Sequence, residues 1–172
     1  SLARAVTHAG DPCAGVPADA PPARVLRAGR AEGPLAGGNL ALLAALCGTP
    51  YLPPLDGAIL VLEDVHEATY RIDRMLRTLL LAGALDGCAA LVAGRFTDCP
   101  EQADADGRRT LADVVGEIGE ALGVPTVLGV PVGHVDDQWT LPLGAPAVLD
   151  ARDDVALTVR WPVAAPPPPL RS

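Results

Sequence analysis

A continuous apolar run, Ala58–Leu62, is the feature that most constrains the fold of this chain. A strand with one wet face alternates apolar and polar residues, whereas a short unbroken apolar run is typical of a strand buried on both faces. Gly57 stands directly before the run and marks where the strand opens. The rest of the chain must therefore cover this strand from two sides.

Strand and helix patterns alternate on both sides of that run. Such an alternation implies right-handed crossovers and a parallel sheet. Helix caps support the boundaries: Asn39 can cap one helix, Thr110 with Asp113 resembles a capping box, and Gly123 is a typical helix end. We expect further strands at Ala23–Leu26, Cys88–Val92 and Pro125–Leu128, and helices over 40–47, 69–82 and 111–122.

The spacing of apolar residues changes near the end of the chain to every second position. Val155, Leu157, Val159 and Trp161 alternate with more polar positions. Together with Ala147–Leu149 they predict an antiparallel hairpin with one wet face. The sequence therefore predicts an α/β fold with a mainly parallel sheet and a smaller antiparallel layer.

The glycine-rich stretch Gly33–Asn39 leads into the first expected helix. It lacks both the Gly-x-Gly-x-x-Gly and the Gly-Lys-Ser/Thr phosphate motifs, so we interpret it as a turn followed by a helix cap. We expect three parts along the chain: a linker or remnant of a missing N-terminal domain over 1–23, one domain over 24–161, and a Pro-rich tail over 162–172. The chain does not begin with Met and resembles an excised or processed piece.

Charge and composition exclude several function classes. The net charge is −8 and the thirteen basic residues, all Arg, are scattered, which argues against nucleic acid as a partner. The apolar runs are too short to span a membrane. The four cysteines form no Cys-x-x-Cys pair, and Cys47 and Cys88 lie in apolar segments. We therefore expect reduced thiols and a cytoplasmic location.

Two residues are candidates for a catalytic pair. Glu63 follows the apolar run, and His134 lies a few residues beyond another expected strand. The carboxyl ends of parallel strands share one edge of the sheet, so we expect the two residues to lie close together, with Glu63 orienting the imidazole. The only serines, Ser1 and Ser172, are at the ends, so no nucleophile accompanies the pair.

Other interpretations of these residues stay open. Glu63 and Asp64 could be solvated or could cap the next helix, and the Gly-His pair at 133–134 could be an ordinary turn. A metal site could involve Asp64, His66 and Glu67, or the acids after His134, but no metal-binding spacing supports one. We expect neither a metal nor a cofactor. Three residues would contact substrate if their helix start faces the cleft, and otherwise form helix surface: Tyr70, Arg71 and Arg74.

Several short motifs resemble, in order, the C-terminal half of the LD-carboxypeptidases, a family that includes the microcin C immunity peptidases. The resemblance covers roughly Arg24 to Asp150. The motifs are Gly37-Gly38-Asn39-Leu40, Leu43, Gly48-Thr49-Pro50-Tyr51, Leu62-Glu63-Asp64-Val65, Tyr70–Arg74, Gly94–Cys99, Gly133-His134 and Thr140–Gly144.

The resemblance implies a swivelling β/β/α-type domain and a Ser–His–Glu triad, with Glu63 and His134 as the family's Glu and His. The Ser would lie in a missing N-terminal domain, within a Gly-x-Ser-Asp motif. The family's members commonly form homodimers and release a terminal D-amino acid from cytoplasmic murein peptides. Three functions follow as hypotheses: a murein-recycling carboxypeptidase, an immunity-type peptidase acting on aminoacyl-nucleotides, or a non-catalytic binding or dimerisation module. We expect this chain alone to be inactive.

Overall fold

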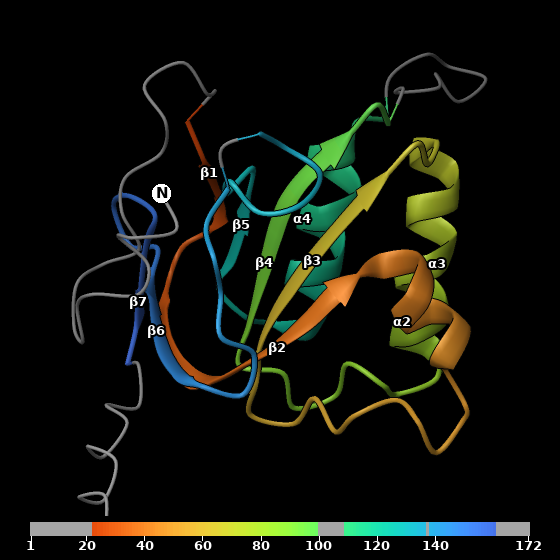
Figure 1. Ribbon diagram of the computed structural model, residues 1–172, viewed down its shortest axis with the longest axis horizontal. Helices are drawn as coiled ribbons and strands as arrows, with labels where there is room; N and C mark the ends of the chain where they lie inside the picture. Colours follow the sequence, from red (N-terminus) through yellow and green to blue (C-terminus); the bar gives the residue numbers. More distant parts are fainter. Residues whose placement is uncertain (1–21, 100–108, 137, 161–172) are drawn as a thin grey trace, which may run out of the picture.

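The computed structural model describes residues 22–99, 109–136 and 138–160 (Figure 1). Nearly all of the expected linker, the whole Pro-rich tail and Trp161 lie outside these residues. Within them, no helix is both long and apolar enough to cross a membrane.

Seven strands form one sheet in the order β1-β5-β4-β3-β2-β6-β7. The four central strands, β5 to β2, run parallel, and antiparallel pairs extend the sheet at both ends. The strands are β1 (Arg24–Arg27), β2 (Arg30–Asn39), β3 (Ile59–Val65), β4 (Ala90–Thr97), β5 (Thr126–Leu128), β6 (Pro146–Asp150) and β7 (Ala156–Val159). The helices are α2 (Leu40–Leu46), α3 (Thr69–Leu81) and α4 (Leu111–Leu122).

Strand β2 is shared by two layers. Its first half, residues 30–34, pairs antiparallel with β6, and its second half, residues 35–39, pairs parallel with β3. Figure 1 shows β2 curving away from the central strands toward β6 and β7. The smaller antiparallel layer that the sequence predicts is therefore built on the same strand as the parallel sheet.

The interpretation of Gly33–Asn39 as a turn is wrong, because this stretch is most of β2. Its glycines give no apolar alternation, which hides the strand from pattern analysis. They are needed for close packing: a Cβ on Gly37 would collide with the carbonyl oxygen of Val61, and one on Gly33 with that of Gly57. The expected cap is confirmed, since the Asn39 side chain accepts a hydrogen bond from Leu42 N at 3.1 Å.

Both faces of β3 are buried, as the apolar run predicts. Leu60 and Leu62 belong to a core formed with the three helices, whereas Ile59 and Val61 belong to a second core formed with β6 and β7. Residues of β3 thus alternate between a helix side and an antiparallel-layer side. The domain consists of three layers: antiparallel strands, parallel strands and helices.

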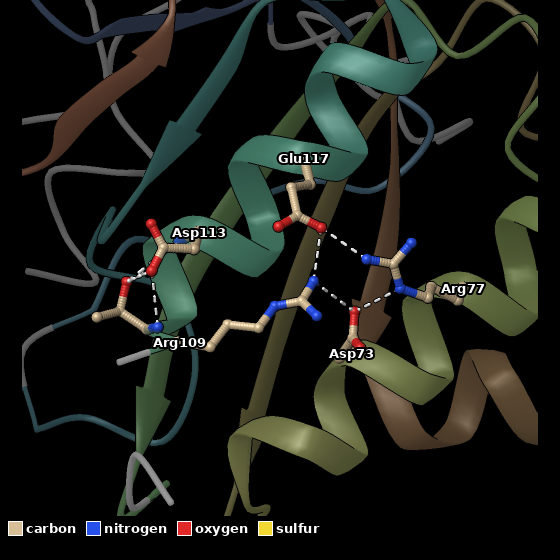
Figure 2. Close-up of polar contacts among 6 residues, drawn as sticks. Asp73, Arg77, Arg109, Asp113 and Glu117 are labelled. Atoms are coloured by element: carbon tan, nitrogen blue, oxygen red, sulfur yellow. Dashed lines mark hydrogen bonds and ion pairs between the residues drawn. The ribbon is translucent and has the colours of Figure 1, made fainter. Parts of the chain in front are cut away.

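An ion-pair network ties α3 to α4 on the helical side (Figure 2). Arg77 Nε lies 2.8 Å from the Asp73 carboxylate, and Arg109 lies 3.2 Å from the same carboxylate. Both guanidinium groups also bond Glu117 at 2.6 Å. At the start of α4 the predicted Thr110–Asp113 capping box is present, and Gly123 ends the helix in the left-handed conformation.

Candidate active site

Glu63 lies inside β3, two residues before its end, and not beyond the strand as the sequence suggested. Because side chains alternate along a strand, Glu63 shares the face of Ile59 and Val61, on the side of the antiparallel layer. Asp64 faces the helices instead. The side chains of these two adjacent acids therefore face opposite layers of the domain.

Asp64 fixes the start of α2. One carboxylate oxygen accepts from Ala41 N at 2.9 Å, and the other accepts from the Asn39 side chain at 3.0 Å and from Val65 N at 2.8 Å. The residue is buried. Asp64 therefore bonds the first turn of α2, the helix that precedes it in the chain, and does not cap the helix that follows, as the capping interpretation expected.

His134 lies in the loop that follows β5, and its Nδ1 is 2.8 Å from Oε2 of Glu63. The predicted proximity of the two residues is confirmed. When Glu63 is ionised its carboxylate is an acceptor only, so Nδ1 carries the hydrogen and Nε2 keeps a lone pair. That arrangement leaves Nε2 able to take a proton from an incoming group.

An open cavity of about 570 Å³ surrounds this pair. The Glu63 side chain is only 11% exposed, whereas that of His134 is 55% exposed. The carboxylate therefore lies at the floor and the imidazole at the rim, within reach of a reacting group from outside. The cavity is lined by Glu63, Val132, Gly133, His134, Val135, Asp136 and Gln138.

A β-bulge in β4 brings residues 129–136, which we call the histidine loop, against Glu63. Leu62 pairs with Ala93 but Asp64 pairs with Phe96, so Gly94 and Arg95 together oppose Glu63. Bulges of this kind are common beside active sites, where they redirect the strand. In the sequence, the glycine is the only sign of this bulge.

Two glycines make the close approach of this loop possible. A Cβ on Gly94 would collide with the carbonyl oxygen of Val132. A Cβ on Gly133 would lie 3.0 Å from both Cβ and Oε2 of Glu63 and 2.9 Å from the Arg95 oxygen, and Gly133 has φ of 122°. Side chains at these positions would push His134 away from its partner.

Of the acids after His134, Asp136 lines the cavity and Asp137 lies outside the described residues. The other candidates do not line the cavity. His66 pairs with Asp98 at 3.4 Å, both exposed, and Glu67 pairs with Arg71. Within the described ranges, no three His, Cys, Asp or Glu residues are grouped to hold a metal ion. Tyr70 bonds Arg71 and does not line the cavity. Arg71 and Arg74 do not line it either, which favours the helix-surface interpretation.

The three cysteines in the described part of the chain are free thiols, and two have perturbed acidity. Burial, with smaller effects of Asp56 and Asp86, raises the pKa of Cys88 to about 11. Burial also raises the pKa of Cys99, whose sulfur accepts a hydrogen bond from Glu67 N. A thiol with a raised pKa is a poor nucleophile near neutral pH, because little of it is present as thiolate.

Comparisons with known proteins show which family the chain resembles. Residues 32–149 match the LD-carboxypeptidase C-terminal domain. The murein tetrapeptide carboxypeptidase of Pseudomonas aeruginosa is 41% identical over 133 residues, which are 77% of this chain and 41% of that protein. The microcin C7 self-immunity protein MccF of Escherichia coli is 30% identical over 125 residues, 71% of this chain and 35% of that protein.

A solved structure gives the same result. The muramoyltetrapeptide carboxypeptidase from Oxalobacter formigenes superposes with a TM-score of 0.77 and 32% identity, covering 93% of this chain and 53% of that one. The chain spans about two-fifths of the length of the curated relatives that it matches. The chain belongs to the LD-carboxypeptidase family and carries its C-terminal domain.

Proposed function

We propose that this chain supplies the glutamate and histidine of a serine-type LD-carboxypeptidase, which releases the terminal D-amino acid from murein-derived peptides during cell-wall recycling. The observation that carries the proposal is the 2.8 Å contact between Glu63 and His134 at an open cavity. The nucleophilic serine would come from an N-terminal domain in a longer protein, since the relatives are more than twice the length of the region they share with this chain.

The chemistry runs through the imidazole. His134 Nε2 takes the proton of the serine hydroxyl as the hydroxyl attacks the scissile carbonyl, and later delivers a proton to the leaving amine. Glu63 holds the Nδ1–H tautomer and stabilises the imidazolium that forms between the two transfers. Its buried position under the ring makes it suited to this role, because a shielded carboxylate interacts more strongly with a nearby cation.

The test uses the longer protein and D-alanine release from murein tetrapeptide. We expect His134→Ala to abolish turnover, and Glu63→Gln to lower it by up to about 10⁴-fold, the size of the comparable change in a serine protease. Asp98→Asn is the matched control, because it removes the carboxylate of the exposed His66 pair away from the cavity. Full activity in His134→Ala would contradict the proposal.

The isolated 172-residue chain should release no D-alanine, because acyl transfer needs a nucleophile beside the base. The similarity to MccF favours a second candidate, a peptidase acting on aminoacyl-nucleotides. Assaying the longer protein on both substrate classes separates the two functions. The family resemblance also supports a cytoplasmic homodimer, which sedimentation of the longer protein would test.

A further inference from the structure

We infer that Thr97 is a positioning residue for the Glu63–His134 pair, and this inference rests on the function proposed above. Its hydroxyl donates a hydrogen bond to the backbone carbonyl oxygen of His134 at 3.0 Å. This bond connects the end of β4 directly to the residue that carries the imidazole. Thr97 does not line the cavity, and its hydroxyl bonds the backbone of His134, so it acts through that backbone.

The histidine loop runs along β4 and is held at three points. Gly129 N donates to the Ala93 oxygen at 2.8 Å, and Arg95 N donates to the Val132 oxygen at 2.8 Å. The third point is the Thr97 hydroxyl. The first two bonds join backbone atoms, whereas the third depends on the Thr97 side chain.

The bulge explains why the Thr97 hydroxyl is available. Before it, Leu91 and Ala93 face the helical core, and after it Phe96 does, so the extra residue reverses the alternation of β4. Thr97 therefore faces the same side as Glu63. Its backbone oxygen accepts from His66 N at 3.0 Å on the β3 side, while its hydroxyl bonds the loop on the other.

The expected effect concerns the tautomer of His134. Loss of the Thr97 bond frees the loop end, so the Nδ1–H form that bonds Glu63 should become less populated. One hydrogen bond in a solvated position corresponds to roughly a 2- to 10-fold change in an equilibrium constant. We therefore expect the ratio of Nδ1–H to Nε2–H tautomer to fall by about that factor in Thr97→Val.

The experiment measures ring ¹⁵N shifts of His134 in the labelled 172-residue chain, assigned with His134→Ala, at a pH where the imidazole is neutral. Thr97→Val should lower the tautomer ratio, and Thr97→Ser should restore it, because serine keeps the hydroxyl. Thr78→Val is the matched control: it removes a similar hydroxyl bond, to the Arg74 oxygen in α3, far from the loop in the chain. It should leave the ratio unchanged.

In the longer protein, Thr97→Val should lower kcat by about 2- to 10-fold with little change in KM, since the bond positions the base and does not bind substrate. A tautomer ratio equal in wild type and Thr97→Val would overturn the inference, as would failure of Thr97→Ser to restore it. These readings do not depend on activity. Failure of the proposed function would instead appear as turnover that survives His134→Ala.

Discussion

The neighbouring acids Glu63 and Asp64 should respond to substitution in opposite ways. Asp64 accepts three hydrogen bonds in a buried site at the start of α2, whereas Glu63 accepts one from a half-exposed ring. We predict that Asp64→Ala costs stability and that Glu63→Gln costs activity. The difference follows from which layer each side chain faces.

The magnitude can be worked from the hydrogen bonds. Asp64→Ala leaves three donors without their acceptor: the N–H of Ala41, the side-chain amide of Asn39 and the N–H of Val65. An unsatisfied buried donor costs about 1–3 kcal/mol, but these three donor residues are half-buried, so water satisfies them in part. We therefore expect a loss of about 3 kcal/mol in the free energy of unfolding. For a domain of this size that corresponds to a fall in Tm of roughly 10 °C. Glu63→Gln keeps an acceptor oxygen and should cost less than about 1 kcal/mol.

Urea unfolding of the 172-residue chain, followed by circular dichroism, measures both values. The midpoint should move for Asp64→Ala with an unchanged m-value, because the surface exposed on unfolding stays the same. Asp64→Asn should fall between the two, since it keeps one acceptor oxygen but loses the charge. If the Glu63→Gln midpoint shifted as far as that of Asp64→Ala, the assignment of stability to Asp64 and of activity to Glu63 would be refuted.

Three other predictions follow from local geometry. Gly133→Ala should lower kcat of the longer protein at least about tenfold and reduce the His134 Nδ1–H tautomer, because its Cβ would press on Glu63; wild-type values of both would refute the steric argument. Cys88 should resist a thiol reagent at pH 8, where a pKa of about 11 leaves only about one thiol in a thousand ionised, and rapid labelling in the folded chain would contradict its burial. Hydrogen bonds from the backbone and side chain of Thr110 lower the pKa of Asp113 below its ordinary value of 3.8. The Asp113 carboxylate therefore stabilises the fold above pH 3.8, and this stabilisation is lost as the pH falls through the folded-state pKa. The Tm difference between wild type and Asp113→Asn should therefore shrink below about pH 4, and a difference independent of pH would show that the charge is irrelevant.

Much of the fold follows from local patterns. The capping box and the glycine predict the observed bounds of α4. The apolar run predicts β3 but ends three residues before the strand does. Strand β2 could not be predicted in this way. Its glycines are required because neighbouring backbone atoms leave no room for a Cβ, and a glycine adds nothing to an apolar pattern. The strand conformation of such a segment is determined by its pairing with strands that are distant in the sequence.

In the site, too, some features follow from local patterns and others depend on pairing between distant strands. The rule that parallel strands present their carboxyl ends at one edge was enough to bring Glu63 and His134 together. The roles of Gly94 and Thr97 depend on the β4 bulge, which exists only relative to the register of β3. A single strand sequence does not contain that register.

The shared strand β2 has a consequence for synthesis of the chain. Its first residue, Arg30, pairs with Asp150, the last residue of β6, so the antiparallel layer closes only after nearly the whole domain has left the ribosome. Until then the face of β3 with Ile59 and Val61 has no cover. A nascent chain paused before Pro146 would present an apolar sheet to other chains, and such species aggregate readily. Residues made early in this domain thus depend on residues made late to bury their apolar face.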